Sequence, residues 1–397
     1  MGFFFARNPT FIPTRNKNDV LKFEKFSSMK LPEKGALPMQ HIRKLMQEGQ
    51  ILYAKEEHIQ PSSLDLSISE EIYRMRGSFL PCKQESIRDI IKEGTLFSTS
   101  LEHPLELNGI YLVRLNESLS LNQQIYGYTN NKSSSGRVNL QTRLLANGIS
   151  QFDHIPLGYK GDIWLEIIPK SFPIKLSCGE RLNQIRFFTG ESKLSIEEHQ
   201  KLQTQFHVLC DASGLPLAKN PLWKTTDGIT MTIDLSSHEI VGYKCSPTTC
   251  RMLDYHKKNL EPEEFFEIIH KPKNGQLVMK RGEFYILNTK EYLRVPHQFT
   301  GEMVPYDPSH GEFRSHYAGF FDPGFGYGAD GELSGTQAVL EIFTNDNDFI
   351  LRDGQPICKM IYEYLTESPE LSYGDPRLGN HYSHQQGPQL SKHFQRI

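Results

Sequence analysis

The most constraining feature of this sequence is a pattern of residues that occurs twice along the chain. The segment YLVRLNESLSLNQQIYG begins at Tyr111 and its counterpart YILNTKEYLRVPHQFTG begins at Tyr285, an offset of 174 residues (285 − 111). Three further pairs of identical residues keep this register: Glu117 and Glu291, Leu119 and Leu293, and Gly127 and Gly301. Self-similarity at a long fixed period is typical of a duplicated structural unit. The chain of 397 residues is therefore predicted to contain two copies of one domain.

Matching segments on both sides extend the duplication. Glu166 in DIWLEI stands opposite Glu341 in QAVLEI, and Asp65 in SLDLS stands opposite Asp234 in TIDLS. The junction between the two copies is placed near LPLAKNPLWK, residues 215–224. We expect four parts: a flexible N-terminal extension over 1–37, a first domain over 38–218, a second domain over 219–366 and a C-terminal tail over 367–397.

Both copies consist of short segments rich in Ile, Val, Leu, Tyr and Phe, separated by Gly, Pro and Asn. Examples are IYLVRL and GDIWLEII in the first copy and FYILN and QAVLEIF in the second. Such segments are typical of the strands of a β-sandwich or β-barrel. Helical signals are few, and we predict helices over 38–49 and 262–271. The predicted fold class is all-β dominated, with two tandem domains and a few short helices.

Composition excludes several kinds of partner. With 44 Lys and Arg against 47 Asp and Glu, the formal net charge is −3, so the chain lacks the basic field of a nonspecific nucleic-acid binder. No stretch approaches the roughly 20 apolar residues of a membrane span. The six cysteines show no C-x-x-C pairing, which favours reduced thiols over a disulfide framework. We therefore expect a cytoplasmic protein with no nucleic-acid or membrane partner, in which any anion is held by a local site.

A serine-rich stretch, NKSSSGR, is the first candidate for such a site. Its hydroxyl groups, backbone N–H groups and the guanidinium of Arg137 are the donors that suit a polyphosphate. The candidate phosphate ligands are Ser133, Ser134 and Arg137. A solvated serine and glycine loop is the alternative.

Two glutamates, Glu166 and Glu341, are the second candidate feature. Each stands within an apolar strand segment, where a buried carboxylate is costly unless it has a partner or a chemical task. An outward-pointing surface glutamate is the alternative for either residue.

Taken together, these motifs resemble a known enzyme family. The collinear segments HIRKLMQEG, SLDLS, SSSGR, DIWLE and LSCGERLNQIRF, followed by HYAGFFDPGFG, AVLE and the tail NHYSHQQGPQLSKHF, are similar to deoxycytidine triphosphate deaminase in its long double-domain bacterial form. The resemblance covers about residues 39 to 397. It implies two tandem dUTPase-like distorted β-barrel (β-clip) domains. It also implies hydrolytic deamination of dCTP to dUTP and ammonia in pyrimidine deoxynucleotide biosynthesis, a homo-oligomer such as a trimer, and dTTP as a feedback ligand.

The resemblance also assigns roles to residues. It implies phosphate binding by Ser133, Ser134 and Arg137, and the tail itself offers Lys392 as a further cation for phosphate. It implies nucleoside binding by the hairpin residues Ala318, Gly319, Phe321 and Asp322 and by the tail residues Tyr373, Tyr382, Gln385 and Gln386. The tail is expected to act as a lid, although it departs from the family pattern at His381, where single-domain enzymes tend to carry Lys.

The two copies have complementary losses. The second copy has YDPSHGEFR in place of the serine pair, and the first has QFDHIPLGYKG in place of the nucleoside hairpin. We therefore expect a composite pocket, with phosphates on the first copy and the nucleoside on the second. In the family such parts generally come from different subunits of a trimer.

Deamination of cytosine requires a water to attack C4, and one carboxyl of raised pKa can move the protons. In the family the glutamate of this strand is catalytic, so Glu341 is preferred, because it follows the better-preserved hairpin, and Glu166 is second. Zinc deaminases instead need H-x-E and P-C-x-x-C, and His310-Gly311-Glu312 has no such partner motif in this sequence. We expect no metal ligands and no cofactor for the chemistry, with Mg²⁺ bound to the triphosphate.

Two other functions remain open from the sequence. A dUTPase, or a bifunctional dCTP deaminase and dUTPase, would use the same phosphate site. A non-catalytic nucleotide-binding regulator would place neither glutamate for chemistry. Asp65 and Asp234 are interpreted as structural aspartates bonded to backbone N–H groups, with a metal–water contact as the alternative.

Overall fold

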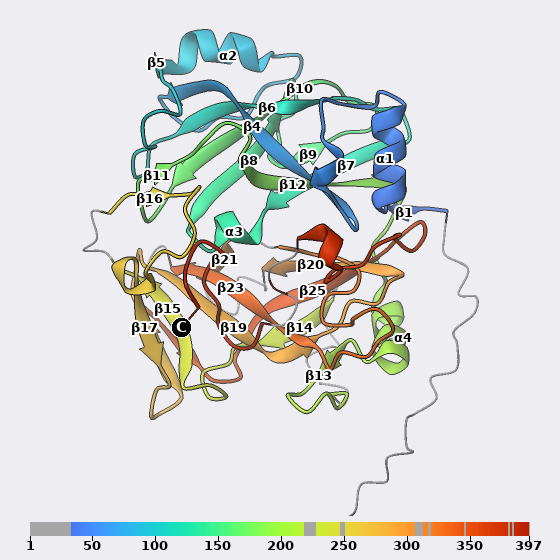
Figure 1. The fold of residues 1–397 in the computed structure, drawn as a ribbon, viewed down its shortest axis with the longest axis vertical. Coiled ribbons are helices and arrows are strands. Elements are labelled where there is room, and N and C mark those ends of the chain that lie inside the picture. Colours follow the sequence, from blue (N-terminus) through green and yellow to red (C-terminus); the bar gives the residue numbers. More distant parts are fainter. Residues whose placement is uncertain are drawn as a thin grey trace, which may run out of the picture. The chain divides into compact units, whose positions relative to one another are not determined.

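The computed structural model describes residues 33–217, 228–246, 251–305, 313–316, 319–344, 347–379, 382 and 385–396. Two groups of strands make up this part of the chain, running from blue to green for the first half and from yellow to red for the second (Figure 1). Strands dominate both halves, as the sequence predicts, and each half curls around its own apolar core.

The first half is one large antiparallel sheet in the order β8-β10-β6-β4-β12-β7-β9. Its main strands are β4 (Ser63–Met75), β6 (Tyr111–Ser120), β7 (Ile125–Asn131), β8 (Leu140–Ala146), β10 (Lys160–Pro169) and β12 (Arg181–Thr189). Shorter strands are β1 (Gly35–Ala36), β2 (Ile51–Leu52), β3 (Ile59–Gln60), β5 (Thr95–Ser98), β9 (His154–Ile155) and β11 (Ile174–Lys175). The helices are α1 (Met39–Gln47), α2 (Ile87–Gly94) and the single turn α3 (Ser133–Gly136).

The second half contains a sheet in the order β17-β15-β19-β23-β21 and another in the order β14-β25-β20-β22. The first of these sheets comprises β15 (Ile240–Cys245), β17 (Phe266–His270), β19 (Phe284–Leu293), β21 (Phe313–His316) and β23 (Thr336–Thr344). The second comprises β14 (Ile229–Thr232), β20 (Phe299–Pro305), β22 (Phe320–Phe321) and β25 (Pro356–Tyr364). The remaining elements are α4 (Ile196–Phe206), β13 (Leu209–Cys210), β16 (Leu253–Asp254), β18 (Gln276–Met279) and β24 (Phe349–Arg352).

Buried glutamates at equivalent positions confirm the duplication. The carboxylate of Glu117 accepts hydrogen bonds from the backbone N–H and the hydroxyl of Ser67, at 3.0 and 2.8 Å. The carboxylate of Glu291 accepts the same two bonds from Thr232, at 2.8 and 2.7 Å. The predicted pairing of these two glutamates therefore reflects one structural device used twice.

The predicted pairing of Asp65 with Asp234 is wrong. Because Ser67 corresponds to Thr232, the counterpart of Asp65 lies within β14, ahead of Asp234. Asp234 lies in the loop that separates β14 from β15, where its carboxylate accepts from the backbone N–H groups of Ser236 and Ser237. Asp234 is thus a structural aspartate bonded to backbone N–H groups, as the sequence predicted. The motifs TIDLS and SLDLS are alike in sequence but do not occupy equivalent positions in the two copies.

The predicted helix over 38–49 is confirmed as α1, which buries Met39, Ile42 and Leu45. The predicted helix over 262–271 is wrong, because this segment is a 3₁₀ turn, Pro262–Glu264, followed by β17. Strand pairing with β15 satisfies the backbone there, and the aromatic side chain of Phe266 is buried. Within the predicted N-terminal extension over 1–37, Gly35 and Ala36 form β1, which is paired with β12.

The segment between the halves packs with the second core. Leu202 and Phe206 of α4 and Leu209 of β13 are buried in the same cluster as Met360 of β25. The chain thus enters the second core ahead of the predicted boundary at 218/219. Part of that junction, residues 218–227, lies outside the described residues.

Segments of the second half complete the core of the first. β16 pairs in parallel with β11, and Phe265 and Phe266 pack edge-on against Phe172. From the tail, Phe394 joins the same aromatic cluster. These contacts hold the two halves together within one chain.

No helix in the described ranges has the length and apolar character needed to cross a membrane. Cys82, Cys178, Cys210, Cys245 and Cys358 are free thiols in the described part of the chain, and Cys250 lies outside it.

Candidate active site

A cavity of about 350 Å³ is lined by both halves of the chain. The first half contributes polar and charged residues, namely Glu57, Gln60, Asp65, Lys132, Ser133, Ser134, Arg137, Arg181 and Gln184. The second half contributes the hairpin, one strand and the tail, with Gly319, Phe320, Phe321, Asp322, Phe325, Val339, Glu341, Tyr373, Tyr382, Gln385 and Lys392. The parts that the sequence analysis assigned to phosphate and to nucleoside therefore meet within a single chain.

The serine stretch forms the single turn α3 at the end of β7. Ser135 donates hydrogen bonds to the carbonyl oxygens of Lys132 and Leu182, which ties the turn to β12. Ser133 and Ser134 line the cavity. The hydroxyl of Ser134 accepts a hydrogen bond of 3.0 Å from the hydroxyl of Tyr255, which belongs to the second half.

Arg137 is a buried guanidinium that the tail surrounds. Its Nη1 donates to the carbonyl oxygen of Gln389 at 3.0 Å, and its Nη2 donates to Oε1 of Gln385 at 3.1 Å. The guanidinium carbon lies 3.9 Å from the centre of the Tyr382 ring, a favourable cation–π geometry. These contacts orient the planar cation.

Glu341 is one of the acidic residues that line the cavity. On β23 the side chains of Ala338, Leu340 and Ile342 enter the second core, so strand alternation turns Glu341 the other way, toward the first half. The residue is only 4% exposed. Burial raises the pKa of its carboxyl to about 8, although the positive charge of Arg137 opposes the shift. A carboxyl in this state can hold or release a proton near neutral pH.

The hairpin closes the other end of the cavity. β22 pairs with β20, and Asp322 follows it as a buried carboxyl that accepts a 2.6 Å hydrogen bond from the hydroxyl of Ser62. The ring of Phe325 lies edge-on to Phe321 at 5.0 Å and to Tyr373 at 5.4 Å, which forms an aromatic wall. Ala318, which the sequence also assigned here, lies outside the described residues.

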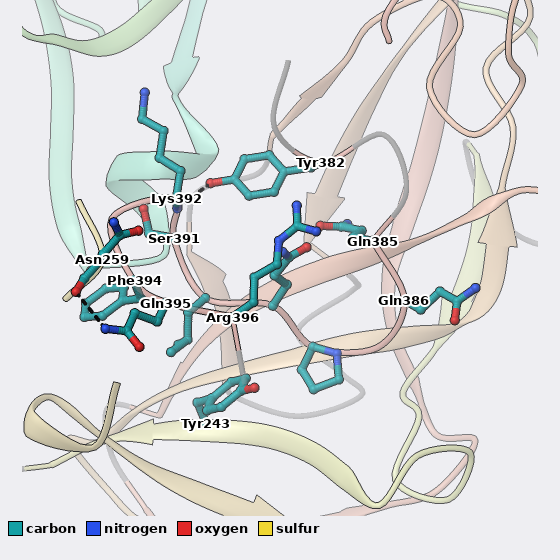
Figure 2. A pocket seen from close by; sticks show the side chains of 13 residues that line it. Tyr243, Asn259, Tyr382, Gln385, Gln386, Ser391, Lys392, Phe394, Gln395 and Arg396 are labelled. Atoms are coloured by element: carbon teal, nitrogen blue, oxygen red, sulfur yellow. Dashed lines mark hydrogen bonds between the residues drawn. The ribbon is translucent and has the colours of Figure 1, made fainter. Parts of the chain in front are cut away.

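The tail contributes most of its predicted residues to the cavity. Tyr373, Tyr382, Gln385 and Lys392 line it, whereas Gln386 does not. Figure 2 shows the neighbouring cavity of about 520 Å³, where Gln386 lies on the opposite side from Lys392. Burial and the positive charges of Lys132 and Arg181 lower the pKa of Lys392 to about 8.

Glu166, the second predicted acid, lies elsewhere. It is buried on β10, next to Trp164, whose ring is covered by Arg88 of α2. Burial raises the pKa of Glu166, and its Oε2 has no hydrogen-bond partner among the described residues. Glu166 does not line the cavity that holds the serine turn.

The sequence analysis missed four charged residues of the cavity, Glu57, Lys132, Arg181 and Arg377, and it assigned a different role to Asp65. Lys132 forms an ion pair with Asp65, and Arg181 lies 3.4 Å from the other oxygen of the same carboxylate. Lys132 directly precedes the serine pair, and Arg181 lies in the LSCGERLNQIRF segment, so both were within quoted motifs. Asp65 therefore pairs with cations at the phosphate end, which differs from the backbone-bonded role expected for it.

The described side chains include no group of three or more His, Cys, Asp or Glu residues arranged to hold a metal ion. His310, Gly311 and Glu312 lie outside the described ranges, as does His381 of the tail.

Comparisons with known proteins agree with this arrangement. Residues 33–191 match the family model of the 2'-deoxycytidine 5'-triphosphate deaminase N-terminal domain, and residues 198–394 match that of the C-terminal domain. The crystal structure of 2'-deoxycytidine 5'-triphosphate deaminase from Agrobacterium tumefaciens is 35% identical, with a TM-score of 0.78, and the match covers 85% of this chain and 98% of that one.

Two curated archaeal relatives are more distant. The "dCTP deaminase, dUMP-forming" of Methanobrevibacter smithii is 29% identical over 132 residues, which is 32% of this chain and 63% of the relative. The protein of the same name from Methanosphaera stadtmanae is 28% identical over 138 residues, covering 34% and 65%. The chain thus spans slightly less than two thirds of each of these relatives.

The resemblance found in the sequence is confirmed by the two domain matches and by the nearly complete coverage of the Agrobacterium protein. This chain belongs to the 2'-deoxycytidine 5'-triphosphate deaminase family.

Proposed function

We propose that this protein catalyses the hydrolytic deamination of dCTP in the cavity between its two halves. Water adds its oxygen to C4 of the cytosine ring, the C4–N4 bond breaks, and the products are dUTP and ammonia. One observation carries the proposal: Glu341, a buried carboxyl with a pKa of about 8, lines the same cavity as the serine turn and Arg137.

The proposed role of Glu341 is to move protons. The neutral carboxyl can donate a proton to the ring nitrogen beside C4, which makes that carbon more electrophilic. The resulting carboxylate accepts a proton from the attacking water and then delivers it to the departing amino group. As ammonia leaves and the C4 carbonyl forms, the remaining hydroxyl proton returns to Glu341, which restores the neutral carboxyl. Each transfer needs a group whose pKa lies near the working pH, which burial provides here.

The proposed phosphate site is the cluster of cations on the first half and the tail. Lys132, Arg137, Arg181 and Lys392 surround the serine turn, and Asp65 offsets part of their charge. Charge-assisted hydrogen bonds from these groups would position the triphosphate. Mg²⁺ would arrive bound to the triphosphate, and no metal is assigned to the attack of water. A trimer, cytoplasmic location and feedback by dTTP stay predictions.

A second candidate function follows from the names of the curated relatives. Both are called dUMP-forming, which describes a protein whose product has lost pyrophosphate as well as the amino group. Asp65 is a carboxylate at the phosphate end of the cavity, where such a hydrolysis would take place. Formation of dUMP is therefore the alternative to dUTP.

The test is incubation of the purified protein with dCTP and Mg²⁺, with dUTP, dUMP and ammonia measured separately. We expect Glu341→Gln to lower kcat by roughly 10²- to 10⁴-fold, the range for loss of a general acid and base. Glu166→Gln is the matched control, since it removes a buried strand carboxyl outside the cavity and should retain turnover. Loss of turnover in Glu166→Gln alone would reverse the assignment. If the unmodified protein binds dCTP but does not turn it over, the alternative of a non-catalytic nucleotide-binding regulator would be favoured.

A further inference from the structure

We propose that Arg186 is a positioning residue for the nucleoside end of the site, which it holds in place through Asp322 and Phe320. Arg186 belongs to the first half and the two residues it holds belong to the hairpin of the second. The inference rests on the proposed function, because Arg186 does not line the cavity itself and acts there only through two residues that do.

The contacts of Arg186 converge on the hairpin. Its guanidinium carbon lies 4.0 Å from the centre of the Phe320 ring, and Nη2 lies 3.8 Å from Oδ1 of Asp322. Nη1 donates to the carbonyl oxygen of Gly301 at 3.3 Å, on the strand paired with β22, and lies 3.5 Å from Glu363. The side chain of Arg186 therefore contacts Phe320 and Asp322 of the hairpin and also the strand that is paired with β22.

Because Arg186 is buried, its charge depends on these contacts. The side chain is fully buried, and its Nε and Nη2 have no hydrogen-bond partner among the described residues. A charge in such a place is costly and is held there by its charged neighbours. Those neighbours are Asp322, Glu363 and, further off, Glu302. Burial and the negative charge of Glu363 raise the pKa of Glu302 to about 7.

Removal of the guanidinium would leave Asp322 and Glu363 as buried carboxyls without their cation. Burial already raises the pKa of Asp322, and the charge of Arg186 acts against that shift. Without Arg186, Asp322 would take up a proton or move, and Phe320 would lose the cation on its face. Both changes displace the hairpin that forms the base and sugar end of the cavity.

The duplication shows that the barrel itself does not need this arginine. Arg186 in LNQIRF corresponds to Ile361 in ICKMIY, because Gln184 and Lys359 occupy equivalent positions on β12 and β25. Ile361 is partly exposed, whereas Arg186 is fully buried where the two halves meet. The guanidinium therefore serves the contact between the halves.

The test compares ligands that report on the two ends of the cavity. Binding of dCTP and of inorganic tripolyphosphate is measured by calorimetry in the unmodified protein, Arg186→Met and Arg186→Lys, together with kcat and KM. We expect Arg186→Met to raise Kd and KM for dCTP about tenfold or more and to change the Kd for tripolyphosphate by less than about twofold. Arg186→Lys retains a cation and should recover part of the dCTP affinity, with kcat close to that of the unmodified protein.

Arg294→Lys is the matched control. Arg294 is also buried, donates to the carbonyl oxygens of Phe206 and Gly331, and stacks on Tyr327, but these contacts involve neither Phe320 nor Asp322. It should leave the Kd for both ligands unchanged. Equal weakening of both ligands in Arg186→Lys, or unchanged dCTP binding in both Arg186 variants, would overturn the proposal. Failure of the unmodified protein to bind dCTP would instead refute the proposed function.

Discussion

Replacement of Glu341 by glutamine tests the physical state of the buried acid. Burial raises the pKa of this carboxyl from 4.5 to about 8 in the folded protein. In the unfolded chain the carboxyl ionises above pH 4.5, whereas in the folded protein it stays neutral until about pH 8. Ionisation therefore lowers the free energy of the unfolded state relative to the folded state across this window. The wild-type fold is penalised progressively as pH rises from 4.5 to 8, and glutamine removes the penalty.

The magnitude follows from linkage. Within the window, each pH unit changes the free energy of unfolding by about 1.4 kcal/mol. Between pH 5 and pH 7, the stability advantage of Glu341→Gln over the wild type should grow by roughly 2 to 3 kcal/mol. Both pH values lie inside the window, so the result depends little on the exact upper pKa.

The assay is urea-induced unfolding of both proteins at pH 5, 6 and 7, followed by fluorescence or circular dichroism. Glu102→Gln, which removes an exposed glutamate, controls for the change in net charge. A stability difference between Glu341→Gln and wild type that is constant over this pH range would refute the reasoning. It would mean that Glu341 is solvated or ionised in the folded protein.

Two further predictions concern the phosphate end. Tyr382→Leu removes the ring that stacks on the guanidinium of Arg137 and should raise the KM for dCTP about 5- to 30-fold. Tyr382→Phe keeps the ring and should have a smaller effect. Equal KM values for the two variants in steady-state kinetics would contradict this prediction. Lys392 is protonated below its pKa of about 8, so the affinity for tripolyphosphate should fall as pH rises through 8, and Lys392→Met should flatten that dependence in calorimetric titrations.

The duplication and the barrel character could be predicted because they depend on local signals. Glu117 and Glu291 keep their register since each satisfies the backbone of a neighbouring strand in its own half. Glu341 was singled out as a carboxylate within an apolar strand segment, and it was preferred over Glu166 because of the family resemblance and the better-preserved hairpin. The duplication and the barrel character depend on periodicity and on fixed spacing, which a single sequence displays.

The errors concern contacts between distant segments. Phe265 and Phe266 resemble helix residues in PEEFFEIIHK, but they pack on Phe172 of the other half, which the sequence does not display. The ion pairs of Asp65 were missed for the same reason, since Lys132 and Arg181 reach it from separate strands. By contrast, the sequence analysis did not predict α4, although a local signal marks its start. This signal is the capping box that Ser195 and Glu198 form in the segment SIEE.

The central claim is that one chain assembles the whole site from its two halves. Arg137→Met removes a group of the first half, and Glu341→Gln removes a group of the second. Co-expression of the two variants, followed by measurement of dCTP turnover in the purified mixture, tests the claim directly. If each site lies within one chain, the mixture shows no more turnover than the two variants measured separately. Recovery of activity in the mixture would show that the halves of different chains complement each other, and would contradict the account.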